Sequence, residues 1–318
     1  MAHTATTAAL LPRDYLLAAD TLYFAVVLAA AGGAPVHCSL RYRRLPGQPP
    51  QKLASGEAHA LLADHYPQFL GYSERLGSEA VLVPAPAIQH VYRPGEALRR
   101  LLEKRDCDAL EQTALHAVQR LTAGGVASAA LGITGSLLPG FHNPLSDIDL
   151  VVYGTGQFHR ARDAVREALA SGLLQGLDEQ AWRDAHARRD CALDFAAYHW
   201  HEQRKYNKFM LDGVKIDLGC VSPDRHDDVR PPVAKLGRVT LRAGVTDDSR
   251  AYDYPAVYGI DSDVADRILC YTATYTGQAC TGEGIEAAGM LERDARGRRY
   301  LVVGTSREAP EEYIKVTG

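Results

Sequence analysis

The sequence predicts an α+β protein built from three units. Helix-like and strand-like patterns alternate in the centre, short strand-like runs with glycine-bearing turns fill the C-terminal part, and a charged, proline-containing segment separates the two. We expect a small N-terminal α+β domain over residues 1–105, a central domain over 106–230 and a C-terminal β-rich domain over 231–318. The chain of 318 residues is long enough for each unit to bury its own core.

The N-terminal unit opens with a leader of small residues, which we expect to be disordered. Residues 22–28 and 36–43 are strand-like runs joined by a glycine-containing turn, which is typical of a β-hairpin. Residues 56–72 space their apolar side chains as one helix face would, although Pro67 could kink the helix, and a proline-punctuated apolar run follows over 80–88. These patterns predict a small α+β domain.

The central unit alternates both kinds of pattern. Residues 108–121 fit an amphipathic helix that ends at a glycine pair, and a strand and a Gly-Ser turn follow. A second strand is predicted over 148–153, a helix over 158–174, and a hairpin over 207–221 that turns at Asp212-Gly213. This order predicts a mixed β-sheet backed by helices.

The C-terminal unit follows the aperiodic segment 224–236, which we interpret as a linker. Residues 273–279, 285–292 and 300–304 are predicted as short strands of a meander, which could close as a small barrel of the oligonucleotide-binding type. Because this unit would have its own core, we expect that residues 237–318 can be removed without loss of the central fold.

Composition limits the classes of function. The formal net charge of −4 argues against a protein that coats nucleic acid through positive potential alone, although a local basic groove is compatible with it. Six scattered cysteines without a C-x-x-C pair favour a reduced, cytoplasmic environment. The apolar run 22–36 is too short to span a bilayer, and the mixed pair Arg13 and Asp14 before it disfavours a signal peptide. We therefore expect no membrane partner.

The segment LGITGSLLPGFHNPLSDIDLVVY carries the chemistry. Gly135 and Ser136 follow an apolar strand, about ten residues intervene, and Asp147 and Asp149 then flank Ile148 at the start of a second strand. Residues i and i+2 of a strand share a face, so both carboxylates can point to one metal centre while Ile148 enters the core. Carboxylate oxygens suit Mg²⁺, or Mn²⁺, especially when substrate phosphates complete the shell.

The Gly-Ser pair is suited to the phosphates. Gly135 has no side chain, so phosphate oxygens can approach its backbone N–H, and Ser136 adds a hydroxyl donor and could begin a helix. A third carboxylate, Asp217, lies in an alternating strand after the Asp-Gly turn, between Ile216 and Leu218. Two cations held by three carboxylates can activate a hydroxyl and stabilise leaving pyrophosphate.

Together these residues resemble the nucleotidyltransferase motif of the DNA polymerase beta-type superfamily, over about residues 108–225. The resemblance implies that Gly135 and Ser136 bind the triphosphate. It further implies that Asp147 and Asp149 ligate both metals and that Asp217 ligates the metal on the nucleophile side. The outer segments LYFAVV and TYTGQACTGEGIEAAGMLE also resemble an uncharacterised archaeal-type group of nucleotidyltransferase-domain proteins.

One departure from the superfamily concerns the third carboxylate. The interval from Asp149 to Asp217 is longer than the commoner spacing and admits an insertion, which leaves Asp194, in Leu193-Asp194-Phe195, as the rival. The resemblance implies an enzyme that transfers a nucleoside monophosphate from an NTP or dNTP to a hydroxyl acceptor, with nucleic acid preferred. The alternatives are nucleotidylation of a protein or small molecule, and a non-catalytic nucleotide or nucleic-acid binding module.

Further polar residues are weaker candidates. Among the basic residues Arg204, Lys205 and Lys208, we expect Lys205 to reach the triphosphate. The pair His199 and His201 lacks further ligands at zinc spacing, so we expect surface residues there, and we expect His142 to be a loop residue rather than a general base. Tyrosines could stack bases or pack in strands, and these are Tyr252, Tyr254, Tyr258, Tyr271 and Tyr275.

Overall fold

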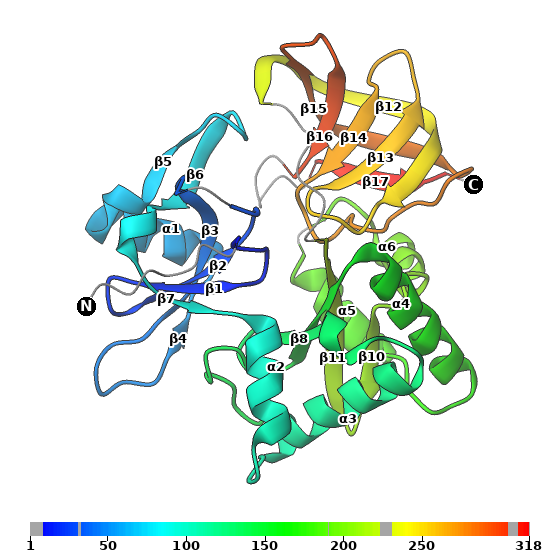
Figure 1. Cartoon of the computed structure of the whole chain (residues 1–318). Helices are drawn as coiled ribbons and strands as arrows, with labels where there is room; N and C mark the ends of the chain where they lie inside the picture. The colour runs from blue at the N-terminus through cyan, green and yellow to red at the C-terminus, as the bar shows by residue number, and fades with distance from the viewer. Residues whose placement is uncertain (1–8, 31–32, 190, 223–230, 305–310, 318) are drawn as a thin grey trace.

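The computed structural model confirms a mixed α+β protein, with three β-sheets and six α-helices in its described part. It describes residues 9–30, 33–189, 191–222, 231–304 and 311–317. Figure 1 shows three lobes, with the N-terminal sheet on the left, the C-terminal strands at the upper right and the central unit below. In the described residues, no helix is long and apolar enough to cross a membrane.

The N-terminal lobe is an antiparallel sheet in the order β5-β6-β3-β2-β1-β7, with β4 paired to β3. Its apolar core lies between this sheet and helix α1, and includes Leu16, Phe24, Leu40 and Leu62. The expected hairpin is present as β2 and β3, and the helix ends before Pro67. The elements are β1 (Tyr15–Ala18), β2 (Leu22–Val26), β3 (Val36–Arg43), β4 (Gln51–Lys52), α1 (Ser55–His65), η1 (Pro67–Phe69), β5 (Leu70–Ser73), β6 (Ser78–Val83), η2 (Ala85–Ala87) and β7 (Ile88–Tyr92).

The central lobe is a four-stranded mixed sheet in the order β10-β11-β9-β8. Strands β9 and β11 are parallel, and the other neighbours are antiparallel. The predicted turn at Asp212-Gly213 joins β10 to β11, and both residues have positive φ angles. The elements are α2 (Pro94–Glu103), α3 (Ala109–Ala123), η3 (Ser128–Ala130), β8 (Leu131–Thr134), β9 (Ile148–Tyr153), α4 (Thr155–Ala170), α5 (Glu179–Ala187), α6 (Phe195–Gln203), β10 (Lys208–Leu211) and β11 (Val214–Val221).

Helix α2 shows that the first boundary expected from sequence, at residue 105, lies too late. Leu98 and Leu101 of this helix pack in the same core as Ile133 and Ile148 of the central sheet. Gly132 of β8 touches Pro94 so closely that a Cβ there would lie 2.8 Å from it. The helix therefore packs with the central unit, although the expected boundary at residue 105 placed its residues in the N-terminal one.

The C-terminal lobe contains five strands that pair in a closed cycle, β12-β13-β14-β16-β15 and back to β12. Strands β14 and β16 are parallel, the other pairs in the cycle are antiparallel, and β17 is added to β15. Two expectations were wrong. Residues 273–279 form no strand, and residues 232–236 of the expected linker begin β12, while 224–230 lie outside the described residues. The strands are β12 (Pro232–Arg250), β13 (Ala256–Asp261), β14 (Arg267–Cys270), β15 (Gly284–Asp294), β16 (Arg299–Val303) and β17 (Tyr313–Val316).

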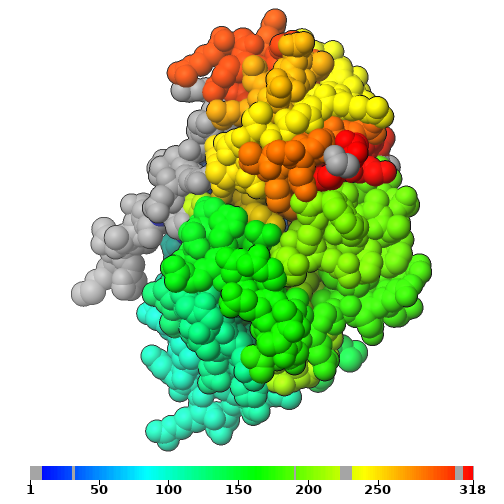
Figure 2. All heavy atoms as spheres, turned by 90° about the vertical axis from the view of Figure 1, so that its right-hand side faces the viewer, coloured from blue at the N-terminus to red at the C-terminus, as the bar shows by residue number. Residues whose placement is uncertain are grey.

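The C-terminal strands share one continuous apolar core with the central unit. This core includes Ile133 and Leu218 of the central sheet together with Leu241, Tyr258 and Ile285 of the closed cycle. In Figure 2 the surface of the C-terminal strands meets the surface of the central helices without a gap. The expectation of a separate C-terminal core was therefore wrong.

Candidate active site

The carboxylates predicted from sequence meet at one end of the central sheet. Asp149 in β9 is the direct register partner of Asp217 in β11, and Thr134 in β8 is the partner of Asp149 on the other side. Asp147 lies just before β9, two residues from Asp149 and therefore on the same face. Ile148 between them is fully buried in the core. Strand alternation thus places Asp147 and Asp149 on one face, and the pairing of β11 with β9 brings Asp217 beside them.

A lysine that the sequence analysis missed lies among these acids. The Nζ atom of Lys215 is 2.7 Å from Oδ2 of Asp147 and 2.8 Å from Oδ2 of Asp217. Loss of hydration lowers the pKa of Lys215, but the attraction of Asp217 and Asp147 outweighs it, so the pKa lies above its usual value. Lys215 and Asp217 are two residues apart in β11 and therefore share a face of the sheet. This spacing was the sequence signal that could have identified Lys215 as a neighbour of the carboxylates.

Burial and charge at Asp149 and Asp217 determine which groups the acidic cluster could hold. Loss of hydration, followed by the nearby charge of Asp217, raises the pKa of Asp149, whereas Arg13 and Lys215 oppose this rise. The Oδ1 atom of Asp217 is buried and has no hydrogen-bond partner in the described part of the chain. A buried carboxylate oxygen without a partner is costly, and a cation can supply that partner.

The Gly135-Ser136 turn lies directly beside Asp149. Gly135 has a φ angle of +65°, and a Cβ built on it would lie 2.2 Å from Oδ2 of Asp149. Glycine is therefore required here by the carboxylate as well as by the backbone conformation. The expected helix after Ser136 is absent, because Ser136 begins a turn in which its carbonyl accepts from the N–H of Phe141 at 2.8 Å.

Asp194, the rival third carboxylate, lies elsewhere. Its side chain accepts a hydrogen bond from the N–H of Ala197 at 2.8 Å and caps the N-terminus of α6. The structure therefore brings Asp217, and not Asp194, to Asp147 and Asp149. The long interval from Asp149 to Asp217 contains α4, α5, α6 and β10.

Lys205, the expected triphosphate ligand, is buried and already paired. Its Nζ atom donates to Oε1 of Glu202 at 2.5 Å and to the carbonyl oxygen of Thr274 at 2.9 Å. Lys208 also pairs with Glu202, and Arg204 pairs with Glu283 and stacks on Trp200. The contacts with Thr274 and Glu283 tie the segment after α6 to the C-terminal lobe, so the structure gives no support to Lys205 as a nucleotide ligand.

The other polar candidates have structural partners. His201, expected at the surface, is buried, and its Nε2 accepts from the N–H of Val316 at 3.1 Å. His142 bonds Oδ2 of Asp108 at 2.8 Å, in a group with Glu111, which itself pairs with Lys104. Tyr258 and Tyr275 are fully buried, so neither can stack a base. Tyr254 and Tyr271 line the cavity described next.

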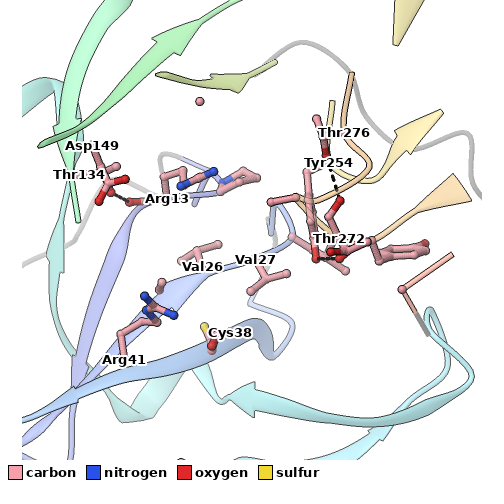
Figure 3. Close-up of a pocket in the computed structure, with 18 of the residues that line it drawn as sticks. Arg13, Val26, Val27, Cys38, Arg41, Thr134, Asp149, Tyr254, Thr272 and Thr276 are labelled. Atoms are coloured by element: carbon pink, nitrogen blue, oxygen red, sulfur yellow. Dashed lines mark hydrogen bonds between the residues drawn. The ribbon is translucent and has the colours of Figure 1, made fainter. Parts of the chain in front are cut away.

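A cavity of about 1140 Å³ opens over the carboxylates and is lined by all three lobes. Figure 3 shows Arg13 beside Asp149 and Thr134, with Arg41 on the N-terminal sheet opposite and Tyr254 and Thr272 on the C-terminal side. Basic side chains outnumber acidic ones among the described lining residues. The basic ones are Arg13, Arg41, Lys52, Arg75, Arg188, Arg189, Lys205, Lys208 and Lys235, and the acidic ones are Glu79, Asp147, Asp149, Asp217, Asp253 and Glu292.

The fold and the site thus define an α+β protein whose three lobes enclose a basic cavity with an acidic cluster at its base. Across 336 aligned residues the chain is 31% identical to "Uncharacterized protein MJ1086" of Methanocaldococcus jannaschii, which covers 96% of this chain and 98% of that protein. The chain belongs to the same family as this archaeal protein. No protein-family model and no solved structure matches the chain.

Proposed function

We propose that the protein is a metal-dependent nucleotidyltransferase with a core of the DNA polymerase beta type. It would transfer a nucleoside monophosphate from an NTP or dNTP to a hydroxyl acceptor and release pyrophosphate. The observation that carries this proposal is the convergence of Asp147, Asp149 and Asp217 from β9 and β11 at the base of the cavity. The turn at Gly135 adjoins the same cluster.

The residues present fit a divalent cation such as Mg²⁺ or Mn²⁺. Asp147 and Asp217 already hold a positive group, the Lys215 ammonium, and Asp217 keeps a buried oxygen without a partner among the described residues. Oxygen-only ligands of this kind are those that Mg²⁺ prefers, together with substrate phosphates. Asp147, Asp149 and Asp217 would therefore be the ligands.

Each group of this chain would have a defined task. The cations would supply charge stabilisation and activate the acceptor hydroxyl. The carboxylates fix where that charge lies, and the backbone N–H groups after Gly135 and the Ser136 hydroxyl would bind phosphate oxygens. Lys215 would keep its bond to one of its two carboxylates and balance the remaining negative charge. Most of the rate enhancement would then come from positioning and electrostatics.

The C-terminal strands support nucleic acid as the acceptor. When the five strands of the closed cycle are numbered 1 to 5 in chain order, they pair in the order 1-2-3-5-4 and back to 1, and strands 3 and 5 are parallel. A five-stranded cycle of this kind is the topology of oligonucleotide-binding folds. Its strand β14 contributes Leu269 to the cavity, and Tyr271 follows directly. The acceptor would then lie between this surface and the carboxylates.

Transfer is tested with labelled NTPs and dNTPs, Mg²⁺ or Mn²⁺, and separate DNA, RNA and protein acceptors. We expect label on nucleic acid and stoichiometric pyrophosphate. Asp147→Asn should lower transfer by at least about a hundredfold, because it removes charge from a shared ligand at nearly constant volume. Asp194→Asn, which removes charge from the rival carboxylate at the cap of α6, is the matched control and should stay within about threefold.

Two results would contradict the proposal. Mg²⁺-dependent nucleotide binding without pyrophosphate release over all acceptors would identify a non-catalytic binding module. Label on protein alone would keep the chemistry and remove the nucleic-acid acceptor.

A further inference from the structure

The backbone of Arg13 is held in an unusual conformation against the candidate active site. Its φ angle is 78°, in the left-handed region that side chains other than glycine rarely adopt. Its N–H donates to the carbonyl oxygen of Val26 at 3.0 Å, and its own carbonyl accepts from Oγ1 of Thr134 at 3.0 Å. Thr134 directly precedes Gly135. Such a conformation persists only where the surroundings impose it, and it is concentrated at functional sites.

The side chain of Arg13 crosses the central sheet. Its carbonyl lies at Thr134 in β8, whereas its Nη2 lies 3.2 Å from the position that a Cβ of Gly219 in β11 would take. Strand β9 with Asp149 lies between β8 and β11, and the charge of Arg13 acts on that carboxyl. The guanidinium therefore lies on the Asp217 side of the cluster, across the carboxylates from the Gly135 turn.

Arg41 reaches the same cavity through a β-bulge. In the pairing of β2 with β3, Tyr23 faces Tyr42 and Phe24 faces Leu40, so Arg41 is the extra residue. Bulges redirect side chains and are frequent beside active sites. Leu40 accordingly packs in the N-terminal core, whereas Tyr42 packs against Phe141 of the central unit. Figure 3 shows the guanidinium of Arg41 pointing into the space near Arg13 and Asp149.

Neither guanidinium has a partner among the residues that the structure describes. Within the described ranges, Arg13 and Arg41 donate no side-chain hydrogen bond and form no ion pair, although both line the cavity. Most other cations of the lining are engaged, for example Lys205 and Lys208 with Glu202 and Lys235 with Glu292. Two unpaired guanidinium groups in one cavity are suited to bidentate recognition of phosphate.

We propose that Arg13 and Arg41 bind the phosphodiester backbone of a single-stranded nucleic-acid acceptor, whose terminal hydroxyl then lies at Asp217. This inference rests on the proposed function and names its acceptor class. The Gly135 turn lies on the β8 side of the carboxylates and serves the donor triphosphate. Arg13 lies on the β11 side, where the acceptor enters. A protein hydroxyl would bring no phosphate for these two arginines.

Binding without catalysis tests the proposal. The probes are fluorescent single-stranded DNA and RNA, each about 12 nucleotides long, titrated by anisotropy in the absence of nucleotide at several salt concentrations. Arg13→Gly and Arg41→Met should each weaken binding about tenfold and lower the salt dependence by about one phosphate contact. Affinity for Mg²⁺·NTP, measured by calorimetry, should stay within about threefold.

The variants are chosen to separate binding from folding. Glycine tolerates the φ angle of residue 13, so Arg13→Gly removes the guanidinium without straining the backbone, and its melting temperature should not fall. Arg242→Met is the matched control, because Arg242 is an exposed arginine of β12 paired with Glu286. Its oligonucleotide affinity should equal that of the parent.

Three results would overturn the proposal. The parent could bind no oligonucleotide, both arginine variants could bind it as tightly as the parent, or NTP affinity could fall as far as oligonucleotide affinity. Failure of the proposed function looks different. In that case the arginine variants lose oligonucleotide binding as expected, while the parent transfers no nucleotide to any acceptor.

Discussion

Two buried carboxylates differ in how well neighbouring groups compensate their charge. Glu202 lies where the central unit meets the C-terminal lobe, and Asp14 lies where it meets the N-terminal lobe. At the C-terminal junction, Glu202 is buried, which by itself raises its pKa, but Lys205 and Lys208 outweigh this and hold the pKa at about 2. At the N-terminal junction, burial raises the pKa of Asp14 to about 6, and the N–H of Leu11 and the charge of Arg93, 3.5 Å away, compensate only in part. The C-terminal junction is therefore the more fully paired.

The packing of apolar side chains is also more extensive at the C-terminal junction than at the N-terminal one. The closed strand cycle shares its core with the central sheet. His201 of α6 and the residues just after this helix, Arg204 and Lys205, bond to Val316 of β17 and to the loop residues Glu283 and Thr274 of the C-terminal lobe. The N-terminal sheet has its own core and meets the central unit through a small aromatic cluster around Tyr23, Tyr42 and Phe141. We infer that the C-terminal strands complete the central fold, whereas the N-terminal lobe is a separate wall of the cavity.

The largest effect is expected from removing either lobe. A chain without residues 231–318 loses 17 of the 42 buried residues of a continuous core and should not be recovered as a soluble, folded protein. A chain without residues 1–92 keeps α2 and the shared core, so it should stay folded and bind Mg²⁺·NTP, but should bind single-stranded nucleic acid at least about tenfold more weakly. Soluble yield, circular dichroism and the two binding titrations measure this.

A soluble, nucleotide-binding chain without residues 231–318 would refute the idea of a shared core. It would restore the separable C-terminal domain that the sequence pattern suggests.

A smaller effect is expected from Glu202→Gln. The substitution leaves Lys205 buried without its charge partner, and we expect a loss of roughly 3–5 kcal/mol in the free energy of unfolding. Because the pKa of Glu202 is lowered from 4.5 to about 2, its contribution is present above about pH 4.5 and is lost as the pH falls toward 2. Denaturant unfolding at pH 7 and at pH 3 measures both.

Glu179→Gln is the control for Glu202. Glu179 forms an exposed helical pair with Arg183, and its loss should cost less than about 1 kcal/mol. Equal losses for the two variants would show that the C-terminal junction depends no more on its buried pair than on a surface pair.

The smallest change in the free energy of unfolding is expected from Asp14→Asn, and this change is an increase. The folded-state pKa of Asp14, about 6, lies above the ordinary value of 3.8, so ionisation of this buried group destabilises the fold above about pH 6. The variant should therefore be more stable than the parent at pH 8, by up to roughly 3 kcal/mol, and the difference should vanish as the pH falls to about 4. Paired thermal melts across this range measure it.

A variant that is less stable than the parent at pH 8 would show that the Asp14 carboxylate is fully compensated by Leu11 and Arg93. The contrast between the two junctions would then disappear.

Local patterns in the sequence predicted the elements that carry the carboxylates. Strand β9 has the predicted bounds, and the hairpin of β10 and β11 turns at Asp212-Gly213, because alternation and an Asp-Gly turn are local signals. Strand β12 was missed since it is long, charged and mostly exposed, without clear alternation. Helix α2 was not predicted as an element, and the boundary expected at residue 105 placed its residues in the N-terminal unit, because local pattern does not reveal which sheet a segment covers.

By itself, the sequence determined the acidic pair, since Asp147 and Asp149 are neighbours on one strand whose face is fixed by period-two alternation. Only the tertiary structure decided the third carboxylate. Asp194 and Asp217 both lie between apolar residues, but only Asp217 is brought to Asp149 by parallel pairing of β11 with β9. The tertiary structure likewise decided the positions of Arg13 and Arg41, on which the proposed acceptor site rests. The left-handed conformation of Arg13 and the bulge at Arg41 turn these side chains toward the carboxylates only because the N-terminal sheet packs across the site. Packing between segments that are distant in the chain leaves no periodic pattern in the sequence of either segment.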